Sequence, residues 1–76
     1  MYRFSVVIEK ARGNYSAYSP DLPGCIAVGD TVEEVQQHME EAILLHIKGM
    51  IEDQEPIPVP QSSVQYMEIT LPDSAA

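Results

Sequence analysis

The fold is decided by a thirteen-residue stretch, Ser19–Thr31, which reads SPDLPGCIAVGDT. Pro20 and Pro23 hold φ at about −65° and lack an amide donor, so this part of the chain is neither helix nor central strand. Gly24 can adopt the positive φ that a tight turn requires. The apolar run Cys25–Val28 lies between two glycines and predicts a short buried strand. A defined loop is therefore followed directly by a strand.

A capped helix is predicted to start where this stretch ends. Asp30 and Thr31 each stand three residues before a glutamate, which is the spacing of the capping box, so either can be the N-cap. Gly49 interrupts the helical pattern and indicates either close packing or an early end. Apolar residues at helical spacing cover roughly five turns, as expected of a helix that packs on one face of a sheet. They are Val32, Val35, Met39, Ala42, Ile43, His46, Ile47 and Met50.

The residues before the stretch predict two further strands. Tyr2–Ala11 alternates between apolar and polar residues, Gly13-Asn14 is a hairpin turn, and Tyr15–Ser19 reads as the returning strand. With Cys25–Val28 these strands form an antiparallel meander. Ala17 on the inner face would allow a helix to approach closely. The predicted inner face carries Tyr2, Phe4, Val6, Ile8, Tyr15 and Ala17.

The residues after the helix predict a return to the sheet. Pro56–Pro60 alternates proline with Ile57 and Val59 and favours a stiff, extended crossover. Val64–Ile69 alternates well enough for a fourth strand. The predicted fold class is therefore α+β with the order β-β-β-α-β, in one domain over residues 1–70 with a frayed tail over residues 71–76.

Length and composition limit the possible functions. A chain of 76 residues builds only a small core, so self-association as a homodimer or a larger homo-oligomer is expected. Its one cysteine cannot form an internal disulfide, which suits the cytoplasm. No apolar run approaches the roughly 18 residues of a membrane span, and no secretory leader is recognisable. We expect a cytoplasmic protein that does not enter a membrane.

Negative charge is concentrated on the predicted helix. The whole chain carries a net charge of −8, and residues 30–55 hold eight acidic residues against Lys48 alone, a balance of −7. This balance disfavours direct binding of nucleic acids, which needs clustered Lys and Arg. The acidic face either keeps a small domain soluble or steers a basic partner toward the helix.

Two groups of residues are candidates for contacts with partners. Three acids follow the end of the helical pattern, where the helix dipole is negative and proteins usually place Lys or Arg. They either belong to a loop after the helix or await a cationic partner. Asp21 lies in the loop over residues 19–24, which we call the central loop. Together with Asp21, the predicted partner-binding residues are Glu52, Asp53 and Glu55. Leu44, Leu45 and Ile51 lie outside the apolar stripe and predict either a wider core or an oligomer surface.

The sequence predicts no catalytic residues, no cofactor and no metal site. His38 and His46 are eight residues apart, which is not the spacing of a helical zinc pair. His46 is expected in the core or an interface, and His38 on the surface. Cys25 has no neighbour that would lower its pKa and is expected to be buried and inert.

Three motifs in fixed order carry a family resemblance: Tyr15–Cys25 (YSAYSPDLPGC), Gly29–Glu34 (GDTVEE) and Pro56–Pro60 (PIPVP). Over about residues 2–69 the chain resembles the HicB family of antitoxins, in a short form with only the N-terminal domain. The resemblance implies a partly degraded ribonuclease H-like fold whose last strand lies parallel to and beside the first. Because Val6 and Val7 occupy the middle of the first strand, retained ribonuclease H activity is not expected.

The resemblance implies a protein-binding role rather than an enzymatic one. Family members occlude a small basic HicA-like toxin that cleaves messenger RNA, within type II toxin-antitoxin systems. Many members continue into a DNA-binding module, whereas this chain ends at Ala76, so no operator binding is expected from this chain alone. The alternative is an orphan HicB-like scaffold, or a small-molecule binding module without a toxin.

Overall fold

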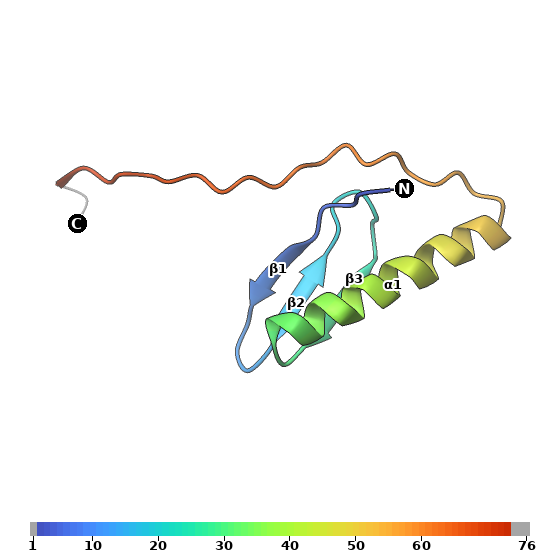
Figure 1. Ribbon diagram of the computed structural model, residues 1–76, viewed down its shortest axis with the longest axis horizontal. Coiled ribbons are helices and arrows are strands. Elements are labelled where there is room, and N and C mark those ends of the chain that lie inside the picture. The colour runs from blue at the N-terminus through green and yellow to red at the C-terminus, as the bar shows by residue number, and fades with distance from the viewer. Residues whose placement is uncertain (1, 74–76) are drawn as a thin grey trace.

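The structure, a computed structural model, describes residues 2–73 (Figure 1). It contains the strands β1 (Val7–Lys10), β2 (Tyr15–Tyr18) and β3 (Ile26–Gly29), followed by the helix α1 (Val32–Glu52). The prediction of an α+β fold with three antiparallel strands and one long helix is confirmed. Part of the predicted frayed tail, residues 74–76, lies outside the described residues.

The three strands form one sheet in the order β1-β2-β3, with both pairs antiparallel. The predicted hairpin turn is confirmed, since the Ala11 amide donates to the Asn14 carbonyl at 2.9 Å. The first strand is shorter than the predicted Tyr2–Ala11. Its ladder starts at the pair Val7 and Tyr18, because Ser19 already belongs to the next turn and residues 2–6 have no partner on β2.

The central loop forms the turn that its prolines predict. The Leu22 amide donates to the Ser19 carbonyl at 3.1 Å, and the Cys25 amide donates to the Leu22 carbonyl at the same distance. The second bond ties Cys25 to the turn, so the third strand begins one residue later than predicted and extends to Gly29. A side chain at Gly29 would meet α1, because an ideal Cβ there lies 2.6 Å from the amide nitrogen of Val35.

The helix begins at the second of the two predicted caps. The Thr31 side chain accepts a hydrogen bond from the Glu34 amide at 3.0 Å, and the Glu34 carboxylate accepts one from the Asp30 amide at 3.3 Å. At the other end Gln54 takes a φ of 58°, and the Glu55 amide donates to the Met50 carbonyl at 2.8 Å. This is a Schellman motif.

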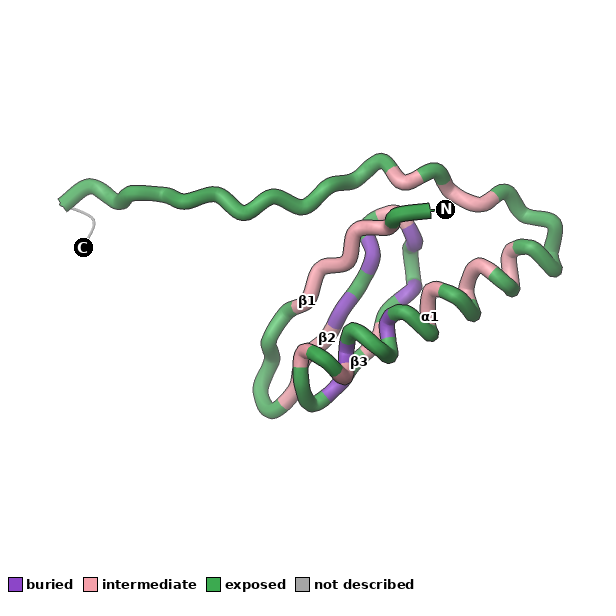
Figure 2. The backbone as a smooth tube through the Cα atoms, in the orientation of Figure 1, coloured by how far each residue is buried: buried purple, intermediate pink, exposed green. Residues whose placement is uncertain are grey.

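The core lies between α1 and the strands β2 and β3 (Figure 2). Phe4, Val6 and Ile8 pack against it from the side of β1, as predicted. Tyr2 was predicted on the inner face but is 55% exposed, and it stacks on Phe4 with ring centroids 5.9 Å apart. The buried apolar residues are Ala17, Leu22, Cys25, Val35 and Met39.

The prediction of a fourth strand is wrong for the described residues. Val64–Ile69 is extended, but no strand is assigned after α1, and the sheet over residues 2–73 has only three strands. Figure 1 shows this segment running away from the sheet. The chain accordingly has a radius of gyration of 15.8 Å, against about 11 Å for a compact chain of this length. We call residues 64–71 the arm.

Replacing Gly49 by alanine is expected to stabilise the fold. The helix continues through Gly49 to Glu52, and an ideal Cβ at this position meets nothing within 4 Å. Because glycine inside a helix costs about 1 kcal/mol relative to alanine, the Gly49→Ala variant should gain about that amount in free energy of unfolding. Urea denaturation followed by circular dichroism measures this gain. A loss of stability instead would mean that Gly49 serves close packing.

Candidate protein-binding surface

The second half of α1 projects beyond the sheet (Figure 1). It carries exposed apolar side chains. Leu44 is 59% exposed, Leu45 73% and Ile51 59%. These residues therefore do not widen the core of a single chain, which was one of the two alternatives. Exposed apolar side chains grouped on one element are typical of contact surfaces. Their role in self-association stays a prediction.

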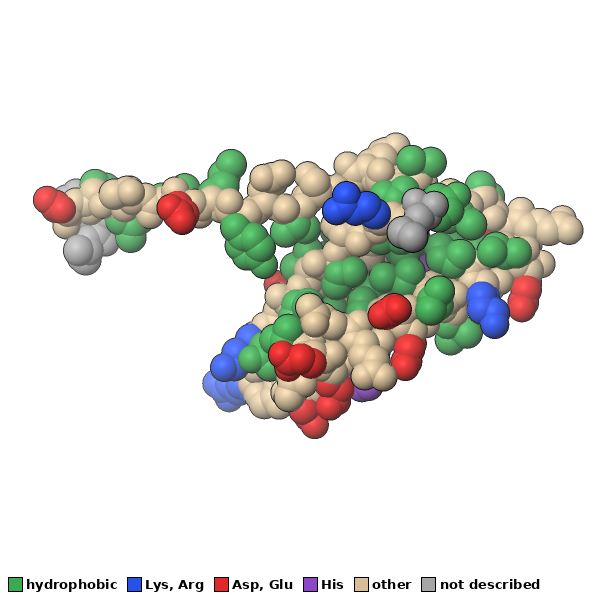
Figure 3. All heavy atoms as spheres, viewed as in Figure 1, with side chains coloured by type: hydrophobic (Ala, Val, Ile, Leu, Met, Phe, Trp, Pro, Cys, Tyr) green, Lys and Arg blue, Asp and Glu red, His purple; other side chains and the backbone are tan. Residues whose placement is uncertain are grey.

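The three predicted acids lie at the C-terminal end of α1. Glu52 is the last helical residue, Asp53 is the C-cap and Glu55 donates the closing hydrogen bond of the Schellman motif, and all three are exposed. Glu52 thus belongs to the helix rather than to a loop after it. The last turn holds no basic residue, and the helix dipole contributes about half a negative charge here. Acidic side chains also gather along the lower face of the molecule in Figure 3.

Asp21 is engaged elsewhere in the fold. Its carboxylate accepts hydrogen bonds from the amides of Gln61 and Ser62 at 3.2 and 3.1 Å, and from the Ser62 hydroxyl at 3.1 Å. The structure thus brings Asp21 to the end of the proline-rich crossover rather than to the acids of α1. No sequence signal indicated this contact, because the partners lie some forty residues apart and an aspartate in a turn is already explained locally.

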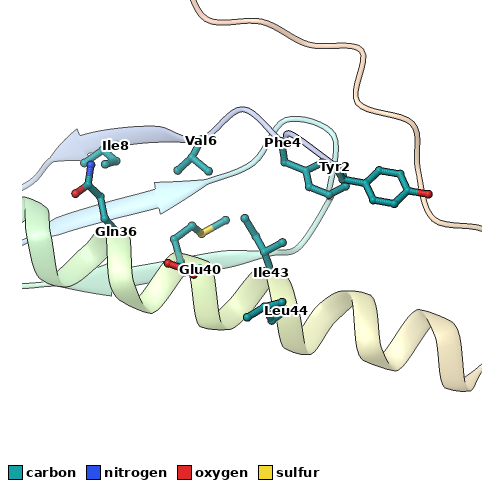
Figure 4. A pocket seen from close by; sticks show the side chains of 9 residues that line it. Tyr2, Phe4, Val6, Ile8, Gln36, Glu40, Ile43 and Leu44 are labelled. Carbon is teal, nitrogen blue, oxygen red and sulfur yellow. The ribbon is translucent and has the colours of Figure 1, made fainter.

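An open groove separates α1 from β1 (Figure 4), with a volume of about 380 Å³. It exists because α1 packs on β2 and β3 and leaves the inner face of β1 half-covered. Gln36 and Glu40 are the polar members of its lining, so the groove suits an apolar side chain better than a polar ligand. The alternation over Tyr2–Ala11 predicted the apolar side chains along β1 and the residues before it. It did not predict that α1 would leave them half-covered. The apolar walls carry Tyr2, Phe4, Val6, Ile8, Met39, Ile43 and Leu44.

His38, His46 and Cys25 are the residues considered for catalysis or metal binding. The Nδ1 atom of the exposed His38 lies 2.7 Å from the Val28 carbonyl oxygen and ties α1 to β3. His46 is half-buried and lines a hollow together with Cys25. Burial raises the pKa of the Cys25 thiol, so its reactive thiolate form is scarce.

Residues 2–73 contain no group of three or more His, Cys, Asp or Glu side chains placed to hold a metal ion. In the same part of the chain, no helix has the length and apolar character needed to cross a membrane.

Residues 4–73 match the family model described as the HicB-like antitoxin of bacterial toxin-antitoxin systems. A structural match is found with a chain of the HicA3 and HicB3 toxin-antitoxin complex. Its TM-score is 0.68 at 28% sequence identity, and the match covers 79% of this chain and 70% of the other.

Curated relatives come from a phage and from distant microbes. An uncharacterized 14.9 kDa protein of Haemophilus phage HP1 is 41% identical over 64 residues, or 84% of this chain, which spans about half (48%) of that relative. A UPF0150 protein of Synechocystis is 39% identical over 70 residues, covering 91% of this chain and 89% of its own length. One of Archaeoglobus fulgidus is 38% identical over 70 residues, covering 88% and 94%.

Proposed function

The chain belongs to the HicB-like antitoxin family of bacterial toxin-antitoxin systems, and from this we propose that it neutralises a small basic, RNA-cleaving toxin by binding it. The similar solved chain comes from a toxin-antitoxin complex, which supports a toxin as the partner. We place this role in the cytoplasm. In this role the chain covers the toxin, which requires no catalytic group, metal or cofactor on this chain.

The acidic end of α1 is the observation that carries this proposal. Glu52, Asp53 and Glu55 are exposed beside the negative pole of the helix, with no basic residue in its last turn. Placing like charge there costs a few tenths to about 1 kcal/mol per residue. A basic partner removes this cost and is steered toward the acids during association.

Binding and protection of RNA together test the proposal. The partner to test is a short basic protein encoded next to the gene for this chain, and the lack of any such reading frame would favour an orphan scaffold. Gel filtration of the mixture should give one complex, and messenger RNA should survive in its presence. Separate elution together with undiminished RNA cleavage would contradict the proposal and favour an orphan scaffold instead.

Charge reversal at the helix end should separate binding from stability. The variant Glu52→Lys with Glu55→Lys should weaken toxin binding about 10-fold or more, because two attractive charges become repulsive. The same change should leave the fold intact or slightly stabilised, since lysine suits the end of a helix. Isothermal titration at two salt concentrations measures the affinity and the electrostatic share of it.

The matched control is Glu9→Lys with Glu41→Lys, which reverses two exposed acids that lie on β1 and in the middle of α1, outside its acidic end. It changes the net charge in the same direction and should alter toxin affinity only slightly. Equal losses of affinity in the two variants would mean that net charge, and not the end of α1, governs binding.

A further inference from the structure

The arm presents a row of apolar side chains to solvent. Residues two apart share one face of an extended chain, and Met67, Ile69 and Leu71 are 80%, 72% and 66% exposed. The opposite face carries Glu68 and Thr70 together with the exposed Val64 and Tyr66. An extended segment without ladder hydrogen bonds is not stable on its own in water. Pairing with another strand would supply these hydrogen bonds to the arm.

The sheet has an open edge that could receive such a strand. β1 is the outer strand in the order β1-β2-β3, and residues 2–6 continue it without a strand assignment. Its inner-face residues Phe4, Val6 and Ile8 form one wall of the open groove (Figure 4). A strand added beside β1 would extend this face, and its own inward side chains would cover the groove from the open side.

The crossover carries the arm away from the edge of its own chain. Residues 60–64 line a hollow together with residues 3–6. The crossover therefore reaches the side of the sheet on which the β1 edge lies. The hydrogen bonds to Asp21 fix Gln61 and Ser62 there, and Pro56–Pro60 stiffens the approach. Beyond this anchor the arm diverges from β1 (Figure 1), which leaves the edge unpaired within the chain.

We propose that the arm of one chain adds as a strand to the β1 edge of a second copy, which returns its own arm. Reciprocal exchange forms a closed two-fold dimer in which both edges and both apolar rows are covered. The proposal deepens the predicted self-association and does not depend on toxin binding.

Length and charge fit this occupant. Eight arm residues span about 26 Å at the usual rise of a strand. This is enough to cover the four residues of β1, which lie beyond residues 3–6, the part of the edge that faces the crossover of the same chain. Glu68 on the arm is acidic, whereas residues 2–10 carry Arg3 and Lys10 against Glu9, a balance of +1 in a chain whose net charge is −8.

The test compares dimerisation of the full chain with that of arm variants. Light scattering over a range of concentrations should give a dimer for the unchanged chain. Met67→Asp with Ile69→Asp should raise the dissociation constant about 100-fold, since it places charges on the buried row in both copies. The control Thr70→Asp adds a charge to the opposite face and should remain dimeric. At a concentration where all of these chains are monomeric, their circular dichroism should be the same, because the arm lies outside the core.

A second measurement identifies the partner of the arm. In a dimer mixed from differently labelled chains, nuclear Overhauser contacts between the arm and β1 should connect unlike chains. A monomer at all concentrations, or arm contacts only within one chain, would overturn the proposal. So would a dimer that survives the two arm substitutions but is lost in Leu45→Asp, which would assign the interface to α1.

Discussion

A Gly29→Ala variant is expected to lose about 3 kcal/mol of its free energy of unfolding, because overpacking against fixed backbone costs about this much. The added Cβ would lie 2.6 Å from the amide nitrogen and 2.9 Å from the Cα atom of Val35. No side-chain rotation can relieve a contact with backbone, so β3 and the first turn of α1 must separate. For a domain with about 5 kcal/mol in total, most of the stability is lost.

The matched control is Gly13→Ala in the hairpin turn. Gly13 has a φ of 77°, and an ideal Cβ there meets nothing within 4 Å. Only the strain of a left-handed residue is added, at about 1 kcal/mol. Urea denaturation of both variants gives the comparison. If Gly29→Ala loses no more stability than Gly13→Ala, then α1 does not pack on β3 as closely as described.

A Leu22→Ala variant should lose about 2 to 5 kcal/mol, the usual cost of emptying a core leucine site. Leu22 is 1% exposed and lies among the buried residues of α1, although it comes from the central loop. Its amide and carbonyl both take part in the turn that begins at Ser19. Loss of its side chain therefore loosens the loop and the core together, and thermal unfolding should show a lower midpoint.

Leu45→Ala provides the corresponding control on α1. Leu45 is 73% exposed, so its truncation should change the unfolding free energy by no more than about 0.5 kcal/mol. Measured on the monomeric chain, the two variants separate the effect of burial from the effect of residue type. Equal losses in both would contradict the core described for the single chain.

Local signals in the sequence predicted the elements that depend on near neighbours. The spacing of Thr31 and Glu34 placed the helix start within one residue, and their hydrogen bonds chose between the two registers. The alternation that includes Phe4, Val6 and Ile8 identified the face that packs on the core. Such signals depend on only a few neighbouring residues, so they can be interpreted without knowledge of the rest of the fold.

Contacts between distant residues were beyond local signals. Val64–Ile69 has the composition of a strand, but alternation specifies a face and not a neighbour, so pairing within the chain did not follow. The bonds from Gln61 and Ser62 to Asp21 join residues some forty positions apart. They determine where the arm leaves the sheet, and no turn or helix pattern encodes them.

The features of the candidate binding surface differ in how far the sequence could place them, and their role in binding stays a prediction. The acids that lack a basic neighbour at the end of α1 could be predicted, because charge at a helix end is readable from the sequence. The groove beside β1 could not, since it depends on how far α1 extends over the sheet. The family itself was identified from the order of three motifs, and the match over residues 4–73 confirms it.

The central claim, neutralisation of a basic toxin by binding, is tested most directly by titrating RNA cleavage. The candidate toxin, a small basic protein encoded beside the gene for this chain, is held at one concentration, and the rate of messenger RNA cleavage is measured as the chain is added. Cleavage should fall in proportion to the added chain and stop at a fixed molar ratio. An unchanged cleavage rate at several-fold molar excess of the folded chain would contradict the claim.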